Sequence, residues 1–99
     1  MSMTTPGTKS FKSASQLFFS YIKHEKQYSA ATYKNYFLDL QKFEYFLSDI
    51  GISQLNDISS NTIQNYINKL HRSGLSATSL ARKASSIRSI FNFLSKKRI

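Results

Sequence analysis

Short hydroxyl side chains and basic side chains alternate along residues 76–89 of this sequence. We take Leu80 as the centre of a buried stripe and advance about 100° per residue, as in an α-helix. The opposite, exposed face then carries Thr78, Ser79, Arg82, Lys83, Ser86 and Ser89, with Ser76 at the helix start. Hydroxyl groups and arginine bind phosphates, arginine also forks onto a guanine edge, and a helix N-terminus attracts anions. A merely solvated face usually carries Glu beside Lys, so this face predicts a polyanionic partner.

A second candidate surface lies on the helix expected over 29–50. Thr32, Lys34, Asn35 and Lys42 lie off its apolar arc. Asn35 could read an adenine edge, although an exposed helical Asn is commonly just solvated. Candidate DNA-binding residues therefore come from two helices that are distant in the sequence.

The sequence contains no pattern that indicates a catalytic site or a metal site. The chain has no Cys, and His24 and His71 have no paired carboxylate at metal-ligand spacing. Its three Gly stand apart, so they form no phosphate-binding loop. Four of the six Tyr lie on apolar stripes and are better explained as core residues: Tyr21, Tyr33, Tyr36 and Tyr66. Tyr28 and Tyr45 look more exposed, but neither has a cluster of Arg and His that would activate it as a nucleophile. We predict no catalytic residue, no metal site and no cofactor.

The charge is strongly basic and unevenly placed. Fourteen Lys and Arg face five Asp and Glu, for a formal net charge of +9. No acid follows Asp57, whereas eight basic residues do. Such a segment repels itself unless a polyanion lies nearby, which favours nucleic acid or an anionic membrane surface. The start of the chain has no secretory pattern and no apolar run reaches the roughly 20 residues of a membrane span, so we expect a cytoplasmic protein.

Periodicity and capping residues predict an all-α bundle of four main helices in two hairpins. The expected helices cover 14–26 with Ser13 as cap, 29–50 with Ser29 as cap and Gly51 after the end, the segment from Ser59–Ser60 to Gly74, and 76–96. The core face of the last helix is expected to be Leu80, Ala84, Ile87, Phe91 and Leu94. Residues 1–12 are expected to form a flexible tail, and 13–97 a single domain.

Two segments together resemble one family. Ser29–Leu47 reads S-x-x-T-x-x-x-Y-x-x-D-L-x-x-F-x-x-F-L, and Ser76–Leu94 reads SATSLARKASSIRSIFNFL. They resemble the second and the last long helix of the core-binding domain in Xer-type tyrosine recombinases and phage integrases. The likeness extends over about 13–97, and the order and separation of the two motifs make it specific.

The resemblance implies a compact orthogonal, SAM-like bundle that grips double-stranded DNA at a recombination half-site. The second and fourth helices would enter the major groove. A catalytic domain with the tyrosine nucleophile would follow residue 99 and would need no metal or cofactor. The isolated domain would be monomeric, would not bind membranes, and would meet other recombinase protomers through the full-length protein on the bacterial nucleoid. The parent would resolve chromosome dimers or integrate mobile DNA.

Two hypotheses from other functional classes stay open. A basic helical module could dock an acidic protein partner, or the bundle could lie on a membrane surface. The membrane reading fits worse, because the basic face lacks adjacent Trp, Phe or Leu that would insert into lipid. Salt-sensitive binding to duplex DNA would favour the recombinase reading, and indifference to DNA would favour the docking module.

Overall fold

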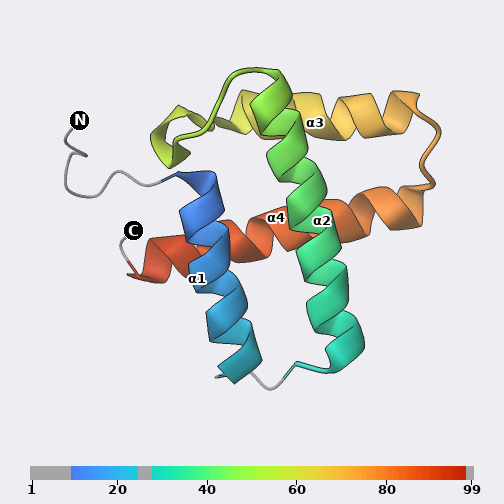
Figure 1. Cartoon of the computed structure of the whole chain (residues 1–99). Coiled ribbons are helices and arrows are strands. Elements are labelled where there is room, and N and C mark those ends of the chain that lie inside the picture. The colour runs from blue at the N-terminus through green and yellow to red at the C-terminus, as the bar shows by residue number, and fades with distance from the viewer. Residues whose placement is uncertain (1–9, 25–27, 98–99) are drawn as a thin grey trace.

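The chain folds as two crossed helical hairpins (Figure 1). The computed structural model describes residues 10–24 and 28–97, so the predicted tail up to residue 9 and the predicted helix end at 26 lie outside these ranges. The elements are α1 (Phe11–His24), α2 (Ala30–Asp49), the 3-10 turn η1 (Leu55–Asp57), α3 (Ser60–Arg72) and α4 (Ala77–Lys97). Helices α1 and α2 lie side by side, and α4 crosses both. The predicted all-α orthogonal bundle is confirmed, and none of the described helices is long and apolar enough to cross a membrane.

The ends of α2 are set by the residues that the sequence predicted. The Ser29 hydroxyl accepts the backbone N–H of Thr32 at 3.1 Å, which caps the first turn. At the other end, Gly51 adopts φ 78°, and the N–H of Ile52 reaches back to the carbonyl of Leu47 at 2.8 Å. This closure satisfies carbonyls that the last turn leaves unpaired.

Helices α3 and α4 begin and end by the same means. Ser59 and Thr62 form a reciprocal capping box at the start of α3. Gly74, with φ 98°, ends that helix, and the Ser76 hydroxyl accepts the N–H of Ser79 at the start of α4. The predicted bounds of both helices are confirmed to within a residue or two.

Helix α1 begins earlier than predicted. Ser10, rather than Ser13, is its cap, since the Ser10 hydroxyl accepts the N–H of Ser13 at 3.1 Å. The N–H of Phe11 donates to the carbonyl of Ser53 at 2.8 Å, and its ring meets Phe43 edge-on with centroids 5.3 Å apart. Phe11 is 1% exposed, so the core reaches into the segment predicted to be a tail.

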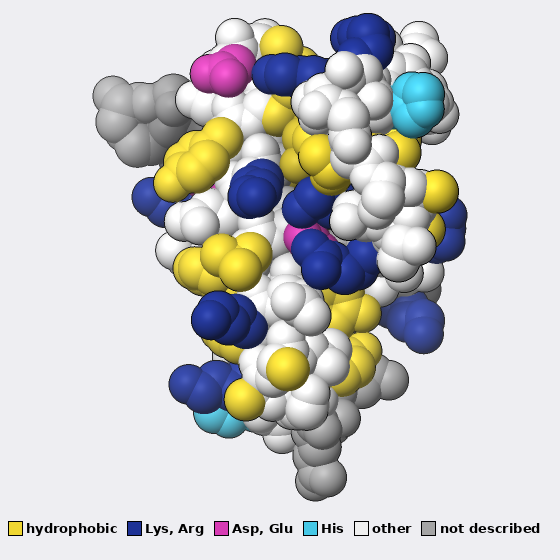
Figure 2. Space-filling view, turned by 90° about the vertical axis from the view of Figure 1, so that its right-hand side faces the viewer, with side chains coloured by type: hydrophobic (Ala, Val, Ile, Leu, Met, Phe, Trp, Pro, Cys, Tyr) yellow, Lys and Arg dark blue, Asp and Glu magenta, His cyan; other side chains and the backbone are white. Residues whose placement is uncertain are grey.

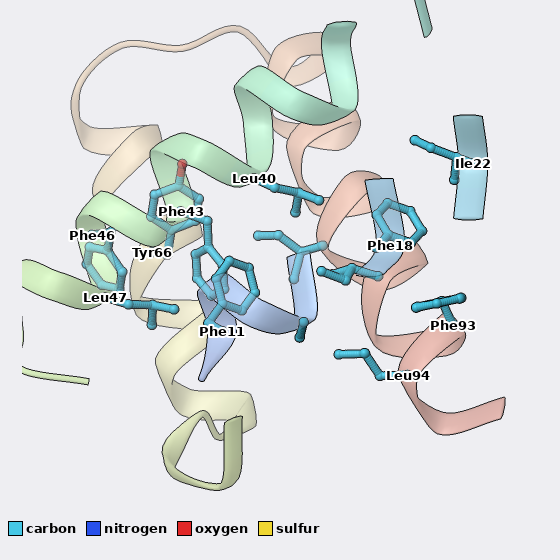
Figure 3. Close-up of a cluster of buried hydrophobic side chains, with 13 residues drawn as sticks. Phe11, Phe18, Ile22, Leu40, Phe43, Phe46, Leu47, Tyr66, Phe93 and Leu94 are labelled. Carbon is cyan, nitrogen blue, oxygen red and sulfur yellow. The ribbon is translucent and has the colours of Figure 1, made fainter. Parts of the chain in front are cut away.

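Aromatic side chains fill the crossing of the hairpins (Figure 3). The Tyr66 ring lies 5.0 Å from the rings of both Phe43 and Phe46, and Phe93 lies 5.5 Å from Phe18. Such rings contribute the largest buried apolar areas in a core of this size. The buried apolar residues are Phe11, Ala14, Phe18, Ile22, Leu40, Phe43, Phe46, Leu47, Tyr66, Ile87, Ile90, Phe93 and Leu94. Leu17 of α1 lies outside this core and is 42% exposed.

Candidate nucleic-acid interface

The two surfaces that the sequence predicted separately meet in a groove between α2 and α4. This α2–α4 groove is lined by Thr32, Asn35, Tyr36, Arg82, Ser85 and Ser86. Four of these six are predicted site residues: Thr32 and Asn35 from α2, and Arg82 and Ser86 from α4. The crossing of α4 behind α2 brings them together although about 50 positions separate them in the chain.

Asp39 lies beneath the groove at the centre of a polar cluster. Its carboxylate is 1% exposed and accepts hydrogen bonds from three residues of α4. Lys83 Nζ donates to Oδ1 at 2.9 Å, and Ser86 Oγ donates to Oδ2 at 2.9 Å. Arg82 donates from Nη2 to Oδ1 at 3.1 Å and from Nε to Oδ2 at 3.3 Å. We call these four residues the Asp39 cluster.

The cluster keeps the carboxylate ionised. Burial by itself raises the pKa of Asp39, but the hydrogen bonds from Lys83, Arg82 and Ser86 lower it by more, so the pKa lies below its ordinary value of 3.8. With Asp39 negative and both Lys83 and Arg82 positive, the cluster retains one positive charge beside the groove.

Two predicted site residues are not on the surface. Lys83 is 6% exposed and Ser86 is 3% exposed, so the prediction that both lie on an outward face is wrong. The buried stripe of α4 is rotated toward them, and Leu80 and Ala84, expected at its centre, are only half-buried. The physical reason is Asp39, whose carboxylate gives a buried ammonium and hydroxyl the partner they would otherwise lack.

The remaining predicted residues do not line the groove. Ser89 is half-buried, and its hydroxyl lies 3.4 Å from the Tyr36 hydroxyl, which extends the polar surface along α4. Ser79 is half-buried at the N-terminus of α4, where its hydroxyl accepts from Ser76. The others are exposed, as predicted: Lys34, Lys42, Ser76 and Thr78. The face turned toward the viewer in Figure 2 carries many Lys and Arg side chains and little acidic surface.

The comparison with protein families decides the identity of the domain. Residues 16–98 match the family described as "Phage integrase, N-terminal SAM-like domain". The chain belongs to this family. The resemblance drawn from the two motifs is thereby confirmed.

Relatives of this integrase N-terminal domain are recombinases. "Tyrosine recombinase XerC" of Lacticaseibacillus casei (strain BL23) is 36% identical over 80 residues, which cover 80% of this chain and 27% of the relative. The protein of the same name from Anoxybacillus flavithermus is 36% identical over 83 residues, covering 84% of this chain and 28% of the relative. That of Vibrio campbellii is 31% identical over 94 residues, covering 92% and 30%. The chain thus spans less than a third of these relatives, and no solved structure matches it significantly.

Three residues of this integrase domain were missed as site residues. Asp39 organises the cluster, and Tyr36 and Ser85 line the groove. All three stand in the two motifs that carried the resemblance, so the signal was present in the sequence. What periodicity alone lacks is the packing of α2 on α4 that turns these positions toward one another.

Proposed function

We propose that this chain is the core-binding domain of a site-specific tyrosine recombinase and binds duplex DNA through the α2–α4 groove. The observation that carries the proposal is Arg82, whose half-exposed guanidinium lies in one groove with Thr32 and Asn35. A guanidinium and an amide suit base edges in a major groove, and hydroxyl groups suit phosphates. The eight basic residues beyond Asp57 supply the attraction to the backbone.

The burial of Lys83 and Ser86 changes their proposed part in this function. Both bind Asp39, so they support the groove from beneath and leave direct contact to Arg82 and the exposed residues. On this view the DNA-contacting set is Thr32, Lys34, Asn35, Lys42, Ser76, Thr78, Ser79, Arg82 and Ser89.

The relatives support a proposal for the whole protein as well. Since each is called a tyrosine recombinase, we infer that the parent of this domain is a site-specific DNA recombinase acting in the cytoplasm on the nucleoid. The domain itself would contribute grip and part of the sequence readout, with chemistry and protomer contacts supplied elsewhere in that protein. Whether the task is chromosome-dimer resolution or integration of mobile DNA depends on the target site.

Fluorescence anisotropy tests the proposal. A labelled duplex carrying a Xer-type recombination site and a scrambled duplex are titrated at about 50 and about 200 mM salt. Salt-sensitive binding that prefers the site duplex supports both DNA binding and sequence recognition by this domain. Equal binding to both duplexes supports DNA binding without sequence recognition. Absence of binding at the lower salt would reject the DNA function and favour a module that docks an acidic protein.

Arg82→Ala locates the contact. The fold should survive, because Asp39 keeps its bonds to Lys83 and Ser86. If Arg82 reads a base, binding to the site should weaken by about 1–3 kcal/mol, and specificity should relax. If Arg82 contacts phosphate only, both duplexes should lose affinity alike and the salt slope should fall by about one. Unchanged binding would remove Arg82 from the interface.

A further inference from the structure

Arg82 is held by one edge only. Its Nε and Nη2 bind the two oxygens of Asp39, which is the side-on, two-bond pairing of guanidinium with carboxylate. Among the described residues no other hydrogen bond engages this guanidinium, and the side chain is 51% exposed. The end-on edge, formed by Nη1 and the second N–H of Nη2, is therefore available to a ligand.

The other end of this pairing is rigid. Asp39 is 1% exposed in the core side of α2, and Lys83 and Ser86 hold its two oxygens from α4. A carboxylate bound at both oxygens has little freedom to rotate, so it passes a fixed orientation to Arg82. Arg82 lines the α2–α4 groove together with Thr32, Asn35 and Ser85.

We propose that Asp39 is a positioning residue for DNA binding: it holds the guanidinium of Arg82 by one edge so that the other edge presents two donors to a pair of acceptor atoms on the duplex. The inference rests on the proposed function. The acceptors are either two oxygens of one phosphate or the O6 and N7 of a guanine. An arginine ordered before binding loses less rotamer freedom on contact, and this is the gain that Asp39 supplies.

A purely structural role for Asp39 makes a different prediction. The buried ammonium of Lys83 needs a carboxylate whether or not DNA is bound, and that need alone would account for an acid at this position. In that case Arg82 would contribute equally to DNA binding with or without Asp39. The two roles can therefore be separated by measuring the contribution of Arg82 in two backgrounds.

The test is a double-mutant cycle in the 99-residue chain. Asp39→Leu together with Lys83→Met removes one negative and one positive charge, so the net charge and the long-range attraction to DNA are unchanged. Both new side chains are apolar and suit a buried position, where such replacements of an ion pair commonly leave a fold intact. Arg82→Ala is then introduced into the unsubstituted chain and into this background. Circular dichroism and thermal melting establish that all four chains are folded.

Binding is measured by anisotropy on the labelled site duplex and on its scrambled version at low salt. Arg82→Ala should weaken binding roughly tenfold in the unsubstituted chain and by under about twofold in the Asp39→Leu/Lys83→Met background. A loss on both duplexes identifies phosphate as the acceptor, and a loss on the site alone identifies guanine. If the Leu variant does not fold, Asp39→Asn/Lys83→Met takes its place, since Asn keeps the shape of Asp.

Three outcomes would overturn the inference. Equal losses in the two backgrounds would make Asp39 purely structural. A greater loss without Asp39 would mean that the carboxylate withholds Arg82 from DNA. If the unsubstituted chain binds neither duplex, the proposed function falls and the inference falls with it, so the failure of each is recognised by a separate result.

Discussion

Burial strips water from the Asp39 carboxylate, and four hydrogen bonds from α4 replace it. The dependence is mutual, because Lys83 is also buried and its ammonium is bonded to that carboxylate. Leaving a buried charge unpaired costs about 3–5 kcal/mol, whereas replacing both partners by apolar residues is often neutral. Removal of Asp39 alone therefore tests stability, and removal of the pair tests function.

Acid should destabilise the fold through Asp39. Its pKa is lower in the folded chain than the ordinary 3.8, so the folded state favours the ionised form. The resulting stability is fully present above the unfolded pKa, near pH 4, and is lost as the pH falls through the folded pKa. Urea unfolding from pH 7 downward should show a decline of the free energy of unfolding below about pH 4. The decline should be shallower in Asp39→Leu/Lys83→Met. An equally steep decline in both chains would contradict the prediction.

Tyr66 offers a stabilising substitution. Its ring is packed between Phe43 and Phe46, but its buried hydroxyl has no hydrogen-bond partner among the described residues. Burial, and then the negative charge of Asp39, raise the pKa of Tyr66 to about 12, so the phenol stays neutral. An unmade hydrogen bond at a buried group costs about 1–3 kcal/mol, and Tyr66→Phe removes the group while keeping the ring.

We expect Tyr66→Phe to raise the free energy of unfolding by about 1 kcal/mol in urea denaturation. Tyr45→Phe is the matched control, because Tyr45 is 62% exposed and its hydroxyl meets solvent. That control should change stability by less than about 0.5 kcal/mol. A clear loss of stability in Tyr66→Phe would show that its hydroxyl is satisfied by water in solution.

At the scale of the elements, local signals predicted more than distant ones. Ser29, Gly51, Ser59 and Gly74 act within a few residues of themselves, and each sets a helix end where the sequence placed it. The start of α1 was misplaced although its cap, Ser10, is local, because both Ser10 and Ser13 are suitable capping residues and Phe11 is held by Ser53, more than 40 positions away. Capping chemistry can be read locally, whereas a contact across the fold cannot.

The residues of the candidate site show the same difference between local and long-range signals. Thr32, Asn35 and Arg82 were predicted one by one from the exposed faces of their helices, and the structure brings them into one groove. The rotation of α4 was not predicted, because periodicity assigns Lys83 and Ser86 to the outside. Burial of these polar side chains is favourable only because Asp39 of α2 accepts their hydrogen bonds, and Asp39 lies more than 40 positions away in the sequence.

The turn after α2 gives a prediction at this scale. Gly51 adopts φ 78°, and a Cβ added there would meet nothing within 4 Å, so the cost of a side chain is conformational and not steric. Gly51→Ala should lower the free energy of unfolding by about 1 kcal/mol. Gly51→Asn should cost less, because Asn tolerates this region of backbone space. Equal stability of all three chains would show that the turn relaxes to another conformation.

At the scale of the whole molecule, the uneven distribution of charge along the sequence becomes an uneven distribution of charge on the surface of the crossed hairpins. The basic second half of the chain forms α3 and α4, and α4 packs across α2 at the Asp39 cluster. The acids lie within the first 57 residues, and Asp39, the one beneath the groove, is bonded to Lys83 and Arg82. The groove therefore keeps a positive surplus that a phosphate backbone would neutralise.

The salt dependence of binding should show which lysines of the domain contact the DNA phosphate backbone. Lys34 and Lys42 are exposed on α2, whereas Lys12 lines a separate groove between α1 and α2 together with Glu44. Each phosphate contact contributes about 0.9 to the slope of log K against log salt, because it releases condensed counterions. Lys34→Gln and Lys42→Gln should each reduce the slope measured with labelled duplex by about that amount. Lys12→Gln removes the same charge and should leave the slope unchanged. A reduction as large as for Lys34→Gln would mean that net charge, and not the position of these lysines on α2, attracts the DNA.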